Sequence, residues 1–460
     1  MLQEEDSSIY NKDFSENINS TFTSEYLDII VDKSVDPCKD FYQFSCGKWL
    51  KSNSLSENDD SISFDSDFVY NIEDFKKDLF SKRIRTKSKV LSNIEELNNY
   101  LEKNRKKMTE SDETLIKDVI GYAVSSMYLE HIYNTKEFQK NIKILRFIMK
   151  GIKNELKYLF NEKQWLEDKL KIKLMEKVDE ITYDTDHADF ANLTILDFCY
   201  KHFKIYKKEN IKKTVSRIKK FLNYSRSNLI IDDFQCRDFL SDSITRASSE
   251  DASYAPSGNL YSFSIPSIRY PNIHSSFPMS LIYGYFGYTF GHEILHGFDN
   301  DGIEFDHRGE ENETFFTGKS KKEFKKLSKC FVNQYNKEKY GKLDVKHNGT
   351  LTLNENIADN GSIKLAHRSY MKYLETAYEQ HIKIPRYEKY SNEQLFFIGV
   401  GRNFCEHRSR ENDLNLQKSD PHSHSRTRTN LMLANYKPFS KAFNCPIGAK
   451  MNPIKKCILW

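Results

Sequence analysis

The sequence predicts a mainly α-helical (α+β) protein, and two kinds of spacing carry this prediction. Apolar residues recur every three or four positions at Phe138, Ile142, Leu145, Ile148, Ile152, Leu156 and Leu159. This is the spacing of one buried helix face. The polar pairs His292/His296 and Glu355/Asp359 are each four positions apart, so each pair shares a face of its own helix. With 460 residues, of which 38% are hydrophobic, the chain can bury one large domain and a smaller lobe.

The first half of the chain combines polar segments with amphipathic helices. Residues 1–20 are polar and acidic, and Ser, Asn and Asp are frequent in 51–67, which predicts a linker or loop there. Lys and Arg are concentrated in 201–220, with the apolar residues Ile211, Val215 and Ile218 between them. Because the net charge is only +4, this pattern favours a solvated helix face over nucleic-acid binding.

The segment Gly291–Asp299 contains the pattern His-Glu-x-x-His. Its two imidazoles, His292 and His296, lie one helical turn apart and can bind one zinc ion at about 2.0–2.1 Å. Glu293 lies beside the first histidine and can take a proton from a water molecule whose pKa the zinc lowers towards about 7. The pattern therefore predicts hydrolysis of peptide bonds, whereas an exposed helix face with two incidental histidines is the alternative.

A second pair of acids supplies the third ligand that a catalytic zinc needs. Glu355 and Asp359 share one face of a helix that we expect to end near Gly361. One carboxylate can bind the metal while the other accepts the free N–H of a ligating histidine. The alternative is a solvated helix start, where acidic residues favour the helix dipole.

Together with these two motifs, the run Asp36–Leu50 and the C-terminal run Met451–Trp460 resemble the neprilysin and endothelin-converting enzyme family of zinc endopeptidases. The resemblance implies a thermolysin-like catalytic lobe with a small β-element. It also implies one zinc ion per chain and a role for each residue of the site. These are His292, His296 and Glu355 as ligands, Glu293 as the general base, and Asp359 as the residue that orients a histidine.

The resemblance extends to residues that would bind substrate. His422 stands where the family stabilises the oxyanion, and Arg428 stands where an arginine binds a substrate carbonyl. Asp251 and Ala252 stand where the family has the Asn-Ala of a substrate-binding strand. An Asp keeps an acceptor but loses the amide donor and adds charge, so the substrate register is expected to differ.

The resemblance also suggests how the chain is divided. The opening signature ends near Leu50 and the similarity resumes at Ile116, so much of the family's helical lobe is expected to be absent and the cleft to be more open. We therefore expect four parts. These are a flexible segment 1–30, an opening segment and linker 31–110, a remnant of the helical N-terminal peptidase region 111–245, and a catalytic domain 246–460.

The eight cysteines indicate an oxidising compartment. The resemblance pairs Cys38 with Cys445, Cys46 with Cys405, and Cys330 with Cys457, while Cys199 and Cys236 either pair or stay free. Reduced thiols in a cytosolic protein are the alternative. Sequons for N-glycosylation begin at Asn19, Asn192, Asn223, Asn312 and Asn348. We expect a glycoprotein that is secreted or lies on the outer face of the plasma membrane.

No apolar stretch is long enough to cross a bilayer, and the longest one is Leu281–Phe290. A leader or membrane anchor is therefore expected to be missing from this sequence. The sequence predicts a zinc metalloendopeptidase that acts on small extracellular peptides and has no nucleic-acid partner. A catalytically inactive, neprilysin-like protein that binds peptides is the alternative function.

Overall fold

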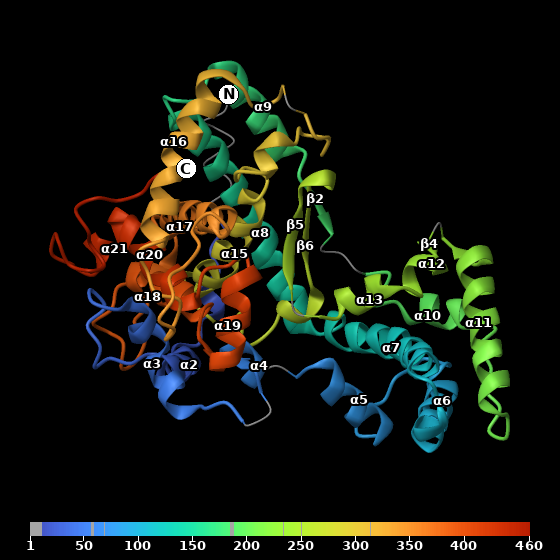
Figure 1. The fold of residues 1–460 in the computed structure, drawn as a ribbon. Helices are drawn as coiled ribbons and strands as arrows, with labels where there is room; N and C mark the ends of the chain where they lie inside the picture. Colours follow the sequence, from blue (N-terminus) through green and yellow to red (C-terminus); the bar gives the residue numbers. More distant parts are fainter. Residues whose placement is uncertain are drawn as a thin grey trace.

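Most of the chain is helical, which confirms the mainly α prediction, and the strands are short (Figure 1). The structure is a computed structural model that describes residues 12–56, 59–68, 70–184, 188–232, 234–249, 251–312 and 314–460. Figure 1 shows a larger lobe built from both ends of the chain and a helical extension that projects to one side of it.

The larger lobe brings N-terminal helices against the C-terminal half of the chain. Its helices are α2 (Ser20–Ile30), α3 (Phe41–Ser52), α4 (Phe64–Phe68), α8 (Lys136–Glu162), α9 (Asp168–Asp179), α14 (Met279–Ile282), α15 (Tyr288–Leu295), α16 (Gly318–Tyr335), α17 (Leu353–Leu374), α18 (Asn392–Arg402), α19 (Arg410–Ser419), α20 (Ser425–Asn435) and α21 (Lys437–Ala442). A π-helical turn, Tyr283–Gly287, joins α14 to α15.

The N-terminal segment is more ordered than we expected from its composition. Residues 1–11 lie outside the described residues, but helix α2 is capped by Asn19, whose side chain accepts the N–H of Phe22. Leu27 and Ile30 of this helix are fully buried. A capped helix with a buried apolar face therefore replaces the expected flexible segment over residues 20–30.

The helical extension contains α5 (Ile72–Phe80), α6 (Leu91–Asn104), α7 (Glu110–Tyr133), α10 (Leu193–Cys199), α11 (Ile211–Asn228), α12 (Cys236–Phe239) and α13 (Asp242–Ala247). Helix α11 carries part of the basic run. Val215 and Ile218 are buried, whereas Lys212, Lys213 and Lys219 are exposed. The lysines therefore form a solvated helix face, as the sequence indicates.

Three small sheets are present among the described residues. The sheet nearest to α15 has the order β2 (Thr182–Asp184), β6 (Leu260–Phe263) and β5 (Ala252–Ala255); β2 is parallel to β6, and β5 is antiparallel to it. Strand β1 (Ser61–Ser63) pairs with β7 (Glu406–Arg408), and β3 (Ile230–Ile231) pairs with β4 (Phe234–Gln235). Strand β1 lies inside the predicted linker 51–67, so part of that segment is fixed by backbone pairing. Strand β5 lies at the edge of its sheet.

Helix α8 buries the apolar stripe that the sequence predicts. Six of the seven stripe residues are buried and Ile142 is partly buried. The same helix carries Glu155, which is fully buried and forms ion pairs with Arg368 at 3.0 Å and Lys372 at 2.7 Å, both from α17. A buried carboxylate needs such partners, so these two ion pairs fix α8 against α17.

Helix α17 continues to Leu374, and our expectation that it ends near Gly361 is wrong. A Cβ atom at Gly361 would lie 2.5 Å from Cδ1 of Leu295 in α15. Glycine is therefore present because α15 and α17 approach closely there, and it does not end the helix.

Four disulfides connect the chain. Three join the pairs that the resemblance implies, Cys38–Cys445, Cys46–Cys405 and Cys330–Cys457, and the fourth joins Cys199 to Cys236. The first two bonds attach the segment around α3 to the C-terminal part of the larger lobe. The fourth lies in the helical extension.

We expect the two bonds that hold α3 to stabilise the fold unequally, depending on the order of their removal. While Cys38–Cys445 is intact, the Cys46–Cys405 bond closes a loop that contains only residues 38–46 and 405–445. Loss of Cys46–Cys405 therefore releases only this short loop in the unfolded chain. The free energy of unfolding should then fall by about 4 kcal/mol in the chain-entropy relation. Loss of the remaining bond, which closes a 407-residue separation, should cost about 6 kcal/mol more. Urea unfolding of the C46A/C405A protein and of the protein without both bonds measures this, and equal steps would contradict it.

Candidate active site

The close contact of α15 and α17 brings the three predicted zinc ligands together. Nε2 of His292 lies 3.2 Å from Nε2 of His296 and 3.1 Å from Oε2 of Glu355, and Nε2 of His296 lies 3.5 Å from Oε1 of Glu355. Ligands at about 2.0–2.1 Å from a tetrahedral zinc ion are separated by about 3.3–3.4 Å. The three residues therefore fit one zinc ion, and their donor set of two imidazoles and one carboxylate suits a catalytic site.

A carboxylate lies beside the outer nitrogen of each histidine. Nδ1 of His292 lies 2.9 Å from Oδ1 of Asp359, and Nδ1 of His296 lies 2.8 Å from Oδ2 of Asp299. Carboxylates in these positions favour the tautomer with the proton on Nδ1, which leaves both Nε2 atoms as donors to a metal.

Asp359 is fully buried at the centre of this arrangement. Arg428 donates two hydrogen bonds of 2.8 Å to its two oxygens, and the hydroxyl of Tyr288 donates a third at 2.5 Å. Burial alone would raise the pKa of Asp359, but Arg428 and His292 outweigh it and hold the pKa well below its usual range. Asp359 therefore remains a carboxylate.

Glu293 lies on the flank of the ligand group, on the helix that carries both histidines. Burial raises the pKa of Glu293, and the neighbouring charges of Glu355 and Asp251 raise it further against the opposing effect of the histidines. A carboxylate with a raised pKa is better matched to accepting a proton near neutral pH.

His422 reaches the site from the loop before α20. Its Nδ1 lies 2.8 Å from Oδ1 of Asp420, and its Nε2 lies 3.1 Å from Oε2 of Glu355. Burial lowers the pKa of His422, but the bonds to Asp420 and Glu355 outweigh burial and raise it overall. His422 is therefore held as a hydrogen-bond donor that faces the site.

A cavity of about 400 Å³ joins these residues to the strand edge. Glu293, His422 and Arg428 line it together with Asp251 and Ala252. The end of β1 and the start of α4 contribute further lining residues, which are Ser63, Asp65 and Ser66. The structure thus brings every predicted ligand, base and substrate-binding residue to one place.

Strand β5 presents its free edge to this cavity. The carbonyl of Asp251 accepts the N–H of Ser264, the residue after β6, so Asp251 pairs inward and the backbone of Ala252 points outward. The N–H of Ala252 donates to Oδ1 of Asp251 at 2.9 Å. The carboxylate of Asp251 therefore covers a donor on the free edge of its own strand.

Comparison with known proteins agrees with this geometry. Residues 251–459 match the model of Peptidase family M13. Neprilysin-1 of Caenorhabditis elegans is 31% identical over 342 residues, which are 74% of this chain and 44% of that protein. The chain belongs to the neprilysin and endothelin-converting enzyme family. Endothelin-converting enzyme 1 of Rattus norvegicus is 38% identical over 209 residues, 45% of this chain and 27% of that protein.

Solved structures show the same fold. Zinc metalloprotease Zmp1 of Mycobacterium tuberculosis, solved with an inhibitor, superposes with a TM-score of 0.55 at 18% identity, over 76% of this chain and 50% of that one. The chain therefore spans less than half the length of Neprilysin-1 and of endothelin-converting enzyme 1. It spans about half of the Zmp1 chain.

Tyr288 and Asp420 were not predicted from the sequence as residues of the site, and neither were Asp299 and Lys177. Asp299 follows His296 by three positions in the turn after α15, and an acid so close to a predicted ligand was the available signal. Lys177 of α9 is fully buried, and its Nζ donates to the carbonyls of Gly297, Gly302 and Phe305 at 2.7–2.8 Å. Nothing local distinguishes this lysine from the other lysines of the chain.

Lys177 holds the loop that follows α15 and carries Asp299. Burial lowers the pKa of Lys177 to about 7, while its three carbonyl acceptors match the three N–H groups of the ammonium form. Gly302 completes the turn, because a Cβ atom there would lie 1.7 Å from the carbonyl oxygen of His296.

We expect Asp299→Asn to weaken zinc binding about 10–100-fold, because His296 loses the carboxylate that orients it. Competition with a zinc-sensitive chelator measures the affinity. The matched control is Asp301→Asn, because Asp301 is exposed. Within the described part of the chain, its carboxylate accepts hydrogen bonds from the side chains of Asn300 and Asn354, and neither of these is a predicted zinc ligand. Equal affinity of the two variants would argue against an orienting role for Asp299.

Lys177→Met should lower the free energy of unfolding by at least about 3 kcal/mol, because three buried carbonyls lose their donor. Lys169→Met is the control, since Lys169 lies on the same helix and is exposed. Urea unfolding monitored by circular dichroism measures both. A loss below about 1 kcal/mol for Lys177→Met would be on the order of the effect of a surface substitution. It would contradict the conclusion that Lys177 holds the loop after α15.

Proposed function

We propose that this protein is a zinc-dependent endopeptidase that cleaves small extracellular peptides. One observation carries the proposal. The ligand atoms of His292, His296 and Glu355 all lie within 4.8 Å of one another, beside Glu293 and at the end of an open strand edge. Membership of the M13 family supports the same activity.

The chemistry divides between the metal and the chain. A bound zinc ion would polarise the scissile carbonyl and lower the pKa of a water molecule towards about 7. Glu293 takes the proton from the attacking water and afterwards delivers it to the leaving amine. Asp359 and Asp299 keep the two histidines in the orientation that binding requires.

We propose that the substrate lies extended along the free edge of β5. The outward N–H and C=O of Ala252 would pair with the substrate backbone, as in other cases of strand addition. The carboxylate of Asp251 must then release the N–H of Ala252. This rearrangement requires an Asp at position 251 and leaves its carboxylate without the N–H of Ala252. Substrates that offer a hydrogen-bond donor or a positive charge to this carboxylate are therefore favoured.

His422 and Arg428 are assigned to the charge that develops on the carbonyl oxygen. The Nε2–H of His422 points at the site and stabilises the oxyanion. Arg428 uses Nε and Nη2 for Asp359, so we assign its Nη1 to a substrate carbonyl. Arg428 therefore has two roles. Its hydrogen bonds in this structure fix Asp359, and the second role is to bind the substrate carbonyl.

We further propose that the protein is extracellular or lies at the cell surface. We also propose that residues 246–460 form the catalytic domain. Four disulfides support an oxidising compartment. Among the described residues, no helix combines the length and apolarity needed for a membrane span. The proposed number of metal ions is one per chain, since the described residues hold one group of His and acidic side chains with this geometry.

Glu293→Gln is expected to reduce the cleavage rate of a quenched fluorescent peptide at least about 10²-fold, because the amide cannot take the proton. Zinc content, measured by atomic emission, should stay at the wild-type level, since Glu293 is not a ligand. The control is Glu310→Gln, an exposed acid whose loss should leave the rate unchanged. Removal of zinc with a chelator should stop cleavage, and added zinc should restore it. A zinc-loaded wild-type protein that binds the peptide without cleaving it would instead be the inactive relative.

A further inference from the structure

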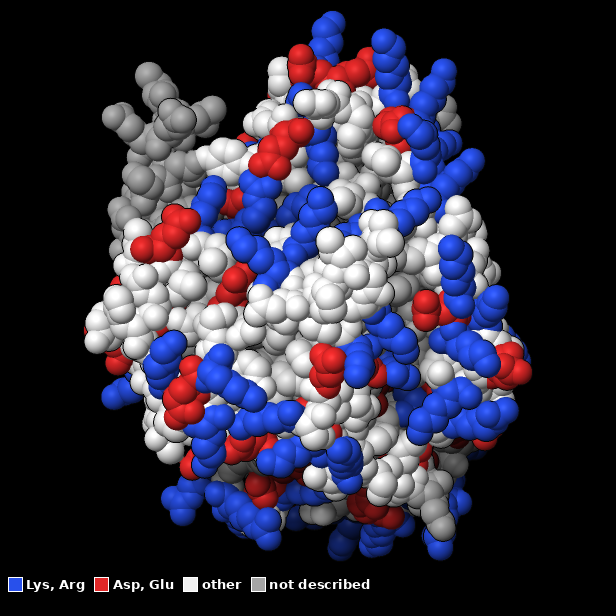
Figure 2. All heavy atoms as spheres, turned by 90° about the vertical axis from the view of Figure 1, so that its left-hand side faces the viewer, with Lys and Arg blue, Asp and Glu red and all other residues white. Residues whose placement is uncertain are grey.

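A second cavity, of about 540 Å³, lies away from the zinc site on the face that carries α16, α17, α20 and α21. This is the side of the molecule that Figure 2 presents, where an uncharged area is bordered by many Lys and Arg side chains. Its size is that of a pocket for a small ligand. Helix α17 separates it from the zinc site, because Asn360, Lys364 and Arg368 lie on the opposite face from Glu355 and Asp359.

The interior of this cavity is apolar. Its walls include Phe331, Ile357, Met432, Leu459 and Trp460, all of which are buried in the core, and the half-buried Met371. The two methionines are flexible and polarisable, so they can adapt to the shape of an apolar ligand.

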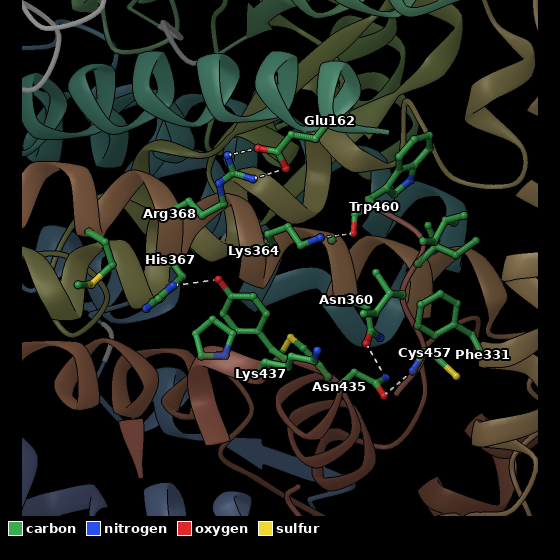
Figure 3. A pocket seen from close by; sticks show the side chains of 18 of the residues that line it. Glu162, Phe331, Asn360, Lys364, His367, Arg368, Asn435, Lys437, Cys457 and Trp460 are labelled. Carbon is green, nitrogen blue, oxygen red and sulfur yellow. Dashed lines mark hydrogen bonds and ion pairs between the residues drawn. The ribbon is translucent and has the colours of Figure 1, made fainter. Parts of the chain in front are cut away.

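The polar groups of the interior are already hydrogen-bonded to one another (Figure 3). Asn435 donates to Oδ1 of Asn360 at 2.8 Å and accepts the N–H of Cys457 at 3.0 Å. His367 and the hydroxyl of Tyr436 are 2.9 Å apart. A ligand therefore does not need to supply hydrogen bonds deep in the cavity, which favours an aliphatic body.

The mouth of the cavity carries more positive than negative side chains. Lys364, Arg368, Lys372 and Lys437 line it, against Glu162 and Glu375. Arg368 pairs with Glu162 at 2.6 Å and with the buried Glu155 at 3.0 Å, and Lys372 also pairs with Glu155. Nζ of Lys364 donates to the main-chain oxygen of Trp460 at 2.6 Å (Figure 3).

Like charges are crowded at one point of this mouth. Lys163 lies next to Lys364 without lining the cavity, and burial together with the charge of Lys364 lowers the pKa of Lys163 to about 7. The pKa of Lys364 is lowered as well, by burial first and then by Arg368. Glu162 offsets part of this repulsion, and an anion placed between Lys364 and Arg368 would relieve the rest.

We propose that this cavity binds a fatty acid, with its aliphatic chain among Met371, Met432 and Trp460 and its carboxylate between Lys364 and Arg368. The apolar walls select the chain, and the cationic mouth selects the acid over a neutral lipid. The ligand would contact the helix that supplies Glu355 and Asp359 without entering the peptide cavity. The proposal does not depend on the proposed peptidase activity.

Isothermal titration calorimetry of the full chain with dodecanoate, below its micelle concentration, tests the proposal. One saturable site is expected. Dodecan-1-ol should bind about tenfold more weakly, because it lacks the charge that Lys364 and Arg368 receive. No saturable binding of dodecanoate, or equal affinity for the alcohol, would overturn the proposal.

Variants then locate the site. Lys364→Gln should weaken dodecanoate binding about tenfold and leave binding of the alcohol unchanged, because it removes one charge and keeps a polar side chain. Lys106→Gln, at an exposed lysine of the helical extension, is the matched control and should change neither affinity. Met371→Trp should abolish binding of both ligands by filling the cavity, with far-ultraviolet circular dichroism to verify folding. Unchanged binding by a folded Met371→Trp protein would place the ligand elsewhere and refute the assignment.

Discussion

The burial of the Asp359 carboxylate between α15, α17 and α20 is the constraint on which the site depends. A charge without exposure is tolerated only when oppositely charged and hydrogen-bonding groups surround it. Arg428 from α20, with His292 and Tyr288 from α15, meets this requirement. The same contacts set the rotation of α17, and this rotation aims Glu355 at the two imidazoles. Stability and metal-binding geometry therefore follow from one buried charge.

A second constraint comes from outside residues 251–459, the region that matches the model of the peptidase family. Lys177 belongs to α9, yet it fixes the loop that holds Asp299 against His296. Helix α8 likewise supports α17 through Glu155. The proposed catalytic domain 246–460 is thus continuous in sequence but incomplete in space. It is completed by α8, α9 and the N-terminal helices that the disulfides attach.

The segment formed by β1 and α4 helps to enclose the cavity that contains Glu293. Residues 61–63 pair with β7, and Asp65 forms an ion pair of 2.5 Å with Arg402, which is buried. Ser63, Asp65 and Ser66 consequently form one wall of the cavity that contains Glu293. A segment whose composition is typical of a linker is therefore part of the site's surroundings, because strand pairing and one buried ion pair fix it.

Local spacing was enough to predict the mainly helical fold, the apolar stripe of α8 and the two pairs that share a helix face, His292/His296 and Glu355/Asp359. These features repeat with the helical period, so they are visible in any short window of sequence. The resemblance to a family added the pairing of six cysteines and the choice of Glu355 as ligand. Tertiary structure alone decided the bond between Cys199 and Cys236, the role of Lys177, the glycine contact inside α17 and the second cavity. Each of these depends on which distant segments pack together, and such contacts leave no periodic signal along the chain.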